Sequence, residues 1–176
     1  MTEYRITLRP ALAGKPAVIR NGVSIEALPE GALLHLLGNP SASAMPGPDA
    51  DVALAGLSLR PVSPGQWFAV GETALPRTTL AALETAVKAK ADIVDQSHGR
   101  VRILVRGPMA VKVLAKGTAV DLALSAFPVG QTATTLIGHI AAHLTRTGDD
   151  AFELIVLRGF AESLWDDLAR MSLEFS

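Results

Sequence analysis

Apolar and polar residues alternate most regularly in the second half of the chain. Residues 91–97 and 100–107 predict two strands that pair through a turn at His98 and Gly99. Alternate residues of the second strand point to opposite faces. One face is apolar and consists of Val101, Ile103 and Val105. The opposite face is rich in arginine and consists of Arg100, Arg102, Leu104 and Arg106. We interpret the arginine face as a solvated edge of the sheet or, alternatively, as a contact for an anion or an acidic partner.

Two helices and a long hairpin complete this half. Pro108 is expected at the first position of a helix that ends at Gly117 in the left-handed conformation. Residues 132–146 predict one long strand, which residues 152–158 follow after a tight turn. An amphipathic helix is predicted over residues 160–171. Its inward face is formed by Phe160, Leu164, Trp165 and Leu168. The predicted order of this half is ββαββα.

The first half predicts a buried strand over residues 31–37 and a hairpin over residues 57–70 that turns at residues 63–65. A helix follows over residues 76–90, with Thr78 as its N-cap. Its apolar stripe has the spacing i, i+3, i+7 and consists of Leu80, Leu83 and Val87. The helix also carries an i, i+4 ion pair in the favourable order, Glu84 with Lys88.

Less regular segments lie near the N-terminus. Residues 1–30 predict an arm with short strands around a turn at Asn21 and Gly22. The arm lies either on its own chain or on a partner, and the sequence leaves both open. Residues 38–50 are rich in Pro, Gly and Ser, which predicts the most mobile loop of the chain.

These elements predict an α+β fold of two small halves, each a helix on an antiparallel sheet. We expect residues 1–176 to form a single domain, with subdomains 1–90 and 91–176. Apolar residues make up 49% of the chain and charged residues only 19%, which indicates either an alanine-rich core or an apolar partner interface.

Composition excludes several function classes. A net charge of −1 gives no general attraction to nucleic acid or to an anionic membrane. The chain has no cysteine, so disulfides, thiolate metal sites and cysteine nucleophiles are excluded, and a cytoplasmic location is expected. No apolar run reaches 18 residues, and the first residues do not resemble a signal peptide.

Candidate chemistry is sparse. His139 and His143 are four residues apart, but on the predicted strand they would lie roughly 13 Å apart, too far for one metal ion. Ser97 and His98 are adjacent in a turn, where their side chains diverge, and no nucleophile elbow occurs. The glycines form neither a dinucleotide fingerprint nor a P-loop. We therefore predict no catalytic and no metal-binding residues, and the cofactor-binding residues stay undefined.

The ordered motifs nevertheless resemble a known family. The turn with Asp95, Ser97, Gly99 and Arg100, followed by a Gly-Pro helix start at residues 107–108, resembles the folate-binding fold of glycine-cleavage aminomethyltransferases. Further segments resemble more closely the gamma subunits of heterotetrameric sarcosine oxidases: residues 62–67, 120–122, 126–135, 138–140, 152–154 and 158–165. The likeness covers roughly residues 55–170.

This resemblance implies a non-catalytic small subunit of a complex that oxidises sarcosine to glycine and passes the one-carbon unit to tetrahydrofolate. The implied partners are large alpha and beta flavoprotein subunits, which carry the flavins, the nicotinamide nucleotide and the folate. A small cysteine-rich delta subunit carries the zinc. No cofactor is expected on this chain, and neither nucleic acid nor membrane is an expected partner.

One segment departs from the aminomethyltransferases. Where these enzymes carry a polar turn with a catalytic aspartate, residues 136–142 are largely apolar and contain no acid. The chain also has only about half the length of those enzymes. The alternative function is a stand-alone folate- or small-amine-binding protein, and an independent amine enzyme is the least favoured alternative because catalysis needs positioned acids, bases or cofactors.

Overall fold

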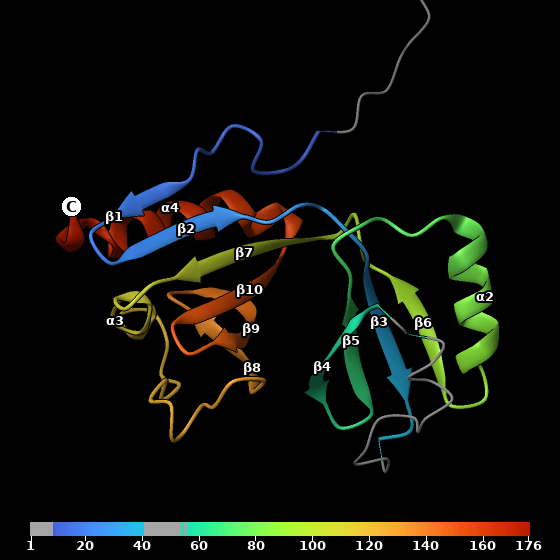
Figure 1. Cartoon of the computed structure of the whole chain (residues 1–176). Helices are drawn as coiled ribbons and strands as arrows, with labels where there is room; N and C mark the ends of the chain where they lie inside the picture. Colours follow the sequence, from blue (N-terminus) through green and yellow to red (C-terminus); the bar gives the residue numbers. More distant parts are fainter. Residues whose placement is uncertain (1–8, 41–53, 55) are drawn as a thin grey trace, which may run out of the picture.

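The structure, a computed structural model, describes residues 9–40, 54 and 56–176 and contains two antiparallel sheets (Figure 1). The larger sheet has the strand order β1-β2-β7-β10-β9-β8. Its strands are β1 (Val18–Arg20), β2 (Val23–Ala27), β7 (Arg100–Arg106), β8 (Thr132–Ile137), β9 (Ile140–Gly148) and β10 (Ala151–Leu157). The smaller sheet has the order β4-β5-β3-β6. It consists of β3 (Leu33–Gly38), β4 (Ser58–Ser63), β5 (Gln66–Val70) and β6 (Ala91–Asp95). The predicted α+β class is confirmed.

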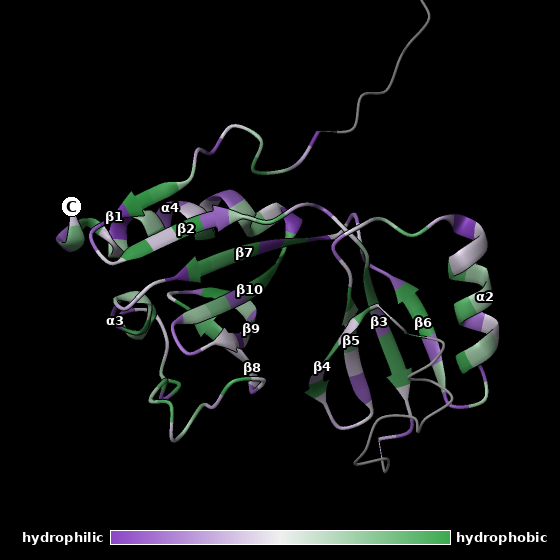
Figure 2. Cartoon of the chain, in the orientation of Figure 1, coloured by the Kyte–Doolittle hydropathy of each residue, from purple (hydrophilic) through white to green (hydrophobic). Residues whose placement is uncertain are grey.

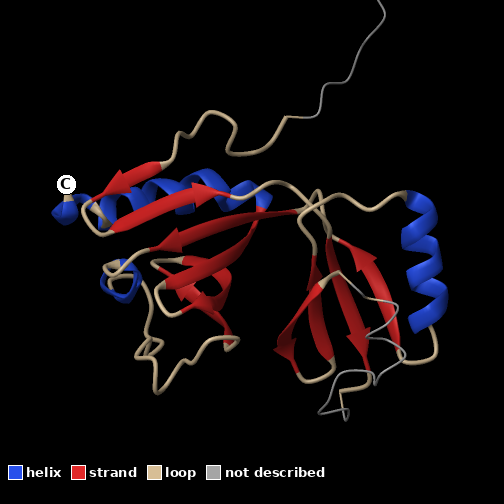
Figure 3. Ribbon diagram, viewed as in Figure 1, coloured by secondary structure: helices blue, strands red, loops and turns tan. Residues whose placement is uncertain are grey.

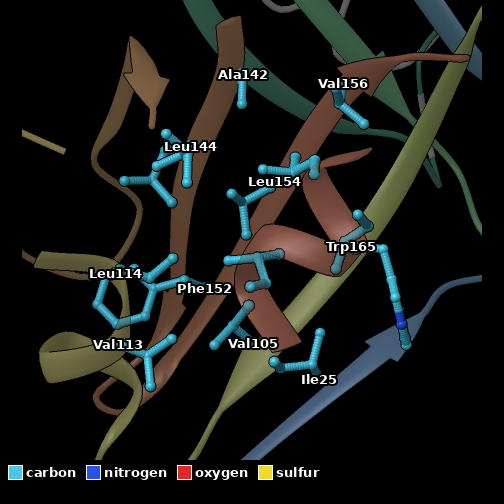
Figure 4. Packing of buried hydrophobic residues seen from close by; sticks show 14 of the residues in the cluster. Ile25, Val105, Val113, Leu114, Ala142, Leu144, Phe152, Leu154, Val156 and Trp165 are labelled. Carbon is cyan, nitrogen blue, oxygen red and sulfur yellow. The ribbon is translucent and has the colours of Figure 1, made fainter. Parts of the chain in front are cut away.

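Two helices cover one face of the six-stranded sheet, α3 (Ala110–Ala115) and α4 (Ala161–Met171). Figure 4 shows side chains of both helices packed against those of the central strands. The strand residues in this core alternate along the chain, as period-2 burial requires. They include Val101, Ile103 and Val105 of β7 and Phe152, Leu154 and Val156 of β10, all at most 2% exposed. The predicted apolar face of β7 is confirmed.

The four-stranded sheet lies between α2 (Arg77–Val87) and the six-stranded sheet (Figures 1 and 3). On the α2 side, Leu34 and Leu36 of β3 pack in a small core with Trp67 and Leu83. β3 is mostly hydrophobic along its length, as Figure 2 shows, because it is an interior strand with both faces covered over part of its length. The strand and hairpin predicted for residues 31–37 and 57–70 are confirmed.

The predicted pairing of residues 91–97 with 100–107 is wrong. Both strands form, but β6 pairs with β3 in the smaller sheet and β7 pairs with β2 and β10 in the larger one. The turn at residues 97–99 is therefore the point at which the chain crosses between the sheets. It is anchored by Ser97, whose Oγ accepts a hydrogen bond from the backbone N–H of Leu33 at 3.0 Å.

The N-terminal arm lies on its own chain over its described residues. β1 and β2 form a hairpin, with Gly22 at φ 82° in its turn, and β2 pairs with β7. The two sheets thus exchange strands across the predicted boundary at residues 90 and 91. β1 and β2 belong to the sheet of the second half, and β6 to that of the first. That the chain forms one domain stays a prediction.

Residues 132–146 form two strands and not the predicted single one. A turn at Gly138, with φ 62°, reverses the chain so that Ile137 pairs with Ile140. Gly117 does not take the left-handed conformation predicted for it. It allows a close approach instead: a Cβ there would lie 3.0 Å from the backbone N of Gly138, which donates a hydrogen bond to the Gly117 carbonyl.

Several predicted helix ends shift by one to three residues. α2 begins at Arg77 with Pro76 as its N-cap, so Thr78 lies inside the first turn and makes no cap hydrogen bond. Pro108 lies in the turn before α3, because Met109 is the N-cap. Phe160 belongs to the 3-10 helix η1 (Arg158–Phe160) and is 53% exposed, so it does not join the buried face of α4. A second such turn, η2 (Leu173–Phe175), ends the chain.

Lys88 forms its ion pair with Asp92, at i+4 towards β6, and not with the predicted Glu84. The loop predicted as most mobile, residues 38–50, lies outside the described residues from position 41 onward. Within the part of the chain that the structure describes, no helix is long and apolar enough to cross a membrane.

Candidate functional site

The two sheets meet at a buried ionic centre around Glu153. This carboxylate lies on β10 and points away from the helix-covered face, because its neighbours Phe152 and Leu154 point towards it. Arg60 of β4 approaches from the other sheet, with Nη1 at 2.7 Å from Oε1 and Nη2 at 2.9 Å from Oε2. Arg102 of β7 donates from Nε to Oε1 at 2.6 Å and from Nη2 to Oε2 at 3.2 Å. Both guanidinium groups therefore form forked contacts with one carboxylate.

Arg102 also connects the centre to the link that follows β5. Its Nη2 donates to Glu72 Oε1 at 2.7 Å, and its Nη1 donates to the backbone carbonyl of Gly71 at 3.3 Å. Arg60, Arg102 and Glu153 are at most 5% exposed, whereas the side chain of Glu72 is 71% exposed. The fully buried part of the centre thus carries two positive charges and one negative charge.

A column of rings lies beside this centre. Phe68 of β5 is tilted against His35 of β3 at 5.0 Å and meets His143 of β9 edge-on at 5.2 Å. The guanidinium carbon of Arg100 lies 4.8 Å from the centroid of Phe68. His35 is fixed by Gln66, whose Oε1 is 3.0 Å from its Nε2. These contacts come from both sheets, so the column joins them.

Burial and charge set the protonation of these groups. Burial alone would raise the pKa of Glu153, but hydrogen bonds and charge from Arg60 and Arg102 lower it below its ordinary value. Burial first, and then the charges of Arg60 and Arg100, lower the pKa of His143 to about 4. His143 is therefore neutral at pH 7, with Nδ1 3.3 Å from Thr134 Oγ1. The ionic centre is fully charged at neutral pH and the histidine beside it is not.

Four buried polar atoms of this region have no hydrogen-bond partner among the described residues: Arg60 Nε, Arg60 Nη1, Thr145 Oγ1 and His143 Nε2. Of these, Arg60 Nη1 is in ion-pair contact with Glu153. Such atoms are costly unless water or another group reaches them. The carboxylate of Glu153 is engaged by two guanidinium groups, so it is not a free base. The ionic centre holds the two sheets together through ion pairs.

A cleft of about 560 Å³ opens on the surface where the chain crosses between the sheets. Its lining combines charged and apolar residues: Arg9, Pro10, Pro29, Glu30, Ala74, His98 and Arg158. Arg158 lines the cleft and connects two other lining residues, because it donates to Glu30 Oε1 at 2.8 Å and to the backbone carbonyl of Arg9 at 2.7 Å. A smaller cleft of about 250 Å³, lined in part by Leu12 and Val101, shares Pro10, Pro29 and Glu30 with it.

The residues singled out in the sequence do not meet in one site. His143 is buried on β9, while His139 is exposed in the β8–β9 turn. Ser97 donates from Oγ to Asp95 Oδ1 at 2.6 Å and stays a turn residue, whereas His98 lines the larger cleft. Among the described residues, no group of three or more His, Asp or Glu has a geometry that holds a metal ion.

The interpretation of the arginine face as a solvated edge is wrong for Arg102, whereas the side chain of Arg106 is 57% exposed. β7 is an interior strand, Arg102 is 4% exposed, and its partners are carboxylates of its own chain. Sequence reasoning missed Glu153 and Arg60 altogether. The available signal was Glu153 itself, a lone acid inside the apolar run of residues 152–157. A charge in such a run requires a buried partner, but its identity depends on strand pairing.

The β8–β9 turn is the segment at which the sequence was expected to depart from the aspartate-bearing turn of the aminomethyltransferases. In this chain the turn contains Gly138 and exposed His139, and it is flanked by Leu136, which is 54% exposed. Residues 136–142 supply no carboxylate there.

The comparisons with known proteins agree with this fold. Residues 47–176 match the family described as the GCVT N-terminal domain. The chain therefore belongs to this family, whose fold the resemblance predicted. A search of curated protein sequences finds no match.

Two solved structures are similar in fold. One is a chain of heterotetrameric sarcosine oxidase from Corynebacterium sp. U-96, solved in complex with pyrrole 2-carboxylate, with TM-score 0.79, 21% identity and 96% coverage of both chains. The other is the glycine cleavage system aminomethyltransferase T from Bartonella henselae, with TM-score 0.60 and 19% identity. That match covers 85% of this chain but only 46% of the enzyme, so the chain spans about half the enzyme's length.

Proposed function

We propose that this chain is a non-catalytic, gamma-type subunit of a sarcosine oxidase-type complex. The observation that carries the proposal is the end-to-end likeness to one chain of a heterotetrameric sarcosine oxidase, with 96% of each chain covered. The aminomethyltransferase, by contrast, continues well beyond the matched part. A chain of this size and fold therefore has a counterpart that works inside an assembly.

The local chemistry supports a structural role. The buried ionic centre joins the two sheets, because Arg60 and Arg102 both donate hydrogen bonds to Glu153. These groups are therefore engaged within the chain. Residues 136–142 carry no acid where the related enzymes need one. In this proposal the oxidation of sarcosine and the transfer of the one-carbon unit to tetrahydrofolate take place on other chains.

The partners are large alpha and beta flavoprotein chains and a small delta chain. Flavins, nicotinamide nucleotide and folate are carried by the large chains, and zinc by the delta chain. The absence of cysteine removes the thiolates that a closed structural zinc site most often uses. The whole complex is proposed to be cytoplasmic.

Co-expression tests the proposal. The tagged full-length chain is expressed with alpha, beta and delta chains from the same organism and analysed by size exclusion and by sarcosine turnover. We expect the four chains to elute together in equal amounts, and the isolated chain to turn over no sarcosine. A chain that elutes alone beside an assembled and active complex of the other three contradicts the proposal.

The second candidate function is a stand-alone folate- or small-amine-binding protein. The cleft of about 560 Å³ beside Arg9 and Arg158 favours it, because its size and mixed lining are typical of small-ligand sites. Calorimetry with tetrahydrofolate and with sarcosine distinguishes the two functions. Heat that saturates at micromolar ligand supports the binder, and no heat at millimolar ligand excludes it.

A further inference from the structure

Arg100 differs from the two other arginines of its strand. Arg102 pairs with Glu153, and Arg106 pairs with Glu26 at 2.8 Å. For Arg100, the described part of the chain provides no ion pair with a carboxylate. All three side chains point from β7 to the same face, so the difference does not come from strand geometry.

The surroundings of Arg100 remove water without supplying a countercharge. Its guanidinium lies over the ring of Phe68, and its Nε donates to the neutral side chain of Gln96. Burial lowers the pKa of Arg100 from its ordinary value. The charge of Arg100 also contributes, after burial, to the lowered pKa of His35. This corner therefore has an excess of positive charge that an added carboxylate would neutralise.

Arg100 also begins a row of side chains across four strands of the larger sheet. Leu157 is its cross-strand neighbour on β10. The register continues the row to Ala141 on β9 and to Leu136 on β8. Beyond Arg100 every member is exposed, Leu157 by 45% and Leu136 by 54%. The row ends at the β8–β9 turn and at the start of η1.

A second apolar row lies on the smaller sheet, on the face that meets the first row. Val94 of β6 is paired with His35 of β3, and Leu37 follows two residues after His35 on the same face. Val94 is 42% exposed and Leu37 38%. Phe68 contacts both His35 and Arg100, so it joins the two rows. We call the exposed apolar side chains of both rows the apolar rim: Leu37, Val94, Leu136, Ala141 and Leu157.

We propose that the apolar rim and Arg100 form the surface on which a large chain of the complex docks, and that this chain places a carboxylate from a segment with apolar neighbours against Arg100. The inference rests on the proposed function and adds the docking surface and the chemistry of its partner. It accounts for exposed leucine and valine side chains on two facing sheets and for an arginine without a countercharge at the same place.

Charge complementarity selects this occupant. An arginine surrounded by apolar contacts is typical of residues that dominate binding energy, because the apolar ring excludes water from the ion pair. Burying Arg100 under a neutral partner would desolvate its charge further at a net cost. A partner with a basic segment would meet the same cost together with repulsion. An acidic segment with apolar flanks complements both parts of the surface: its carboxylate pairs with Arg100, and its apolar residues cover the apolar rim.

Point substitutions in the full-length chain, in the co-expressed complex, test the surface. Leu157 is the direct cross-strand neighbour of Arg100. Leu157→Asp therefore adds a like charge where the partner's carboxylate is expected, whereas Leu157→Lys removes the same apolar contact without that repulsion. We expect the dissociation constant to rise about 10- to 100-fold for Leu157→Asp and for Arg100→Gln, and distinctly less for Leu157→Lys. Leu157 is 45% exposed, and circular dichroism checks that each variant folds.

Leu173→Asp is the control, because Leu173 in η2 is 54% exposed and lies outside the apolar rim. Its affinity should equal that of the wild type. If the wild-type chain assembles and Leu157→Asp and Arg100→Gln bind as it does, the docking surface is overturned while the proposed function stands. Equal losses for Leu157→Asp and Leu157→Lys overturn the acidic partner. A wild-type chain that does not assemble overturns the proposed function and this inference with it.

Two further outcomes assign the surface to another occupant. Concentration-dependent dimers of the isolated chain that Leu157→Asp abolishes identify a second copy of the chain, and they overturn the inference. Saturable binding of a small carboxylate such as acetate or benzoate to the isolated chain, lost in Arg100→Gln, identifies a small-molecule site and overturns it as well.

Discussion

The two faces of the six-stranded sheet are built from the same strands but are stabilised by different physics. The face covered by α3 and α4 is a continuous apolar core, in which Leu154 and its neighbours are fully buried. The opposite face meets the second sheet through Glu153, two guanidinium groups and a ring column. Burial of apolar area is non-directional and tolerates changes of shape. The ionic face depends on each charge having its partner in place.

Removal of the central carboxylate should have the largest effect. Glu153→Gln leaves Arg60 and Arg102 buried without their countercharge. We expect the free energy of unfolding to fall by about 3–5 kcal/mol, the usual consequence of breaking a buried ion pair from one side. Urea denaturation followed by circular dichroism measures it. A loss below about 1 kcal/mol would show that the centre is hydrated and that the comparison of the two faces is wrong.

Truncation on the apolar face sharpens the comparison. Leu154→Ala replaces a side chain with no exposed area, next in sequence to Glu153, and we expect a loss of about 2–5 kcal/mol from lost burial and a residual cavity. Leu154→Met, which nearly conserves volume, should cost less than about 1.5 kcal/mol. The same denaturation experiment measures both variants. No conservative change of Glu153 should be tolerated as well as Leu154→Met is.

Acid should weaken the ionic face. The folded pKa of His143 is about 4, below its unfolded value of 6.5, so the unfolded chain takes up a proton first as the pH falls. His143 therefore contributes stability that is present above pH 6.5 and is lost between pH 6.5 and about 4, by about 3 kcal/mol. The lowered pKa of Glu153 acts in the same direction at lower pH. Urea denaturation across this pH range measures the slope.

His143→Gln should flatten this slope, because glutamine does not titrate. His139→Gln is its matched control, since His139 is exposed in the β8–β9 turn, and it should leave the slope unchanged. If the slope of His143→Gln equals that of the wild type, the acid sensitivity lies elsewhere in the chain.

The smallest effect is expected at the outer end of the centre. Glu72 contacts Arg102 at 2.7 Å, but its side chain is 71% exposed, so water replaces most of the contact. Glu72→Gln should cost less than about 1 kcal/mol in the urea experiment that is used for Glu153→Gln. A cost near that of Glu153→Gln would mean that burial does not set the strength of these pairs.

The local elements were predictable because their signals lie within a few residues. The alternation of Val101, Ile103 and Val105 predicted the buried face of β7, and the period of residues 160–171 predicted the buried face of α4 except at Phe160. The turn at Asn21 and Gly22 was visible for the same reason. Hydrophobic burial acts on every chain with such a pattern, whatever its partners.

Pairing and site were not predictable, because they depend on contacts between residues far apart in the sequence. The turn at residues 97–99 is compatible with either a hairpin or a crossing between sheets. The chain crosses because β6 pairs with β3 and β7 pairs with β10. Arg60 reaches Glu153 across 93 residues. The sequence by itself determined most of the apolar residues that are buried, since apolar burial follows from the local hydrophobic period, but it did not predict the burial of Arg60, Arg102 and Glu153. Only the tertiary structure decided which charges meet, since a salt bridge is set by the distance between its ends and not by their order in the chain.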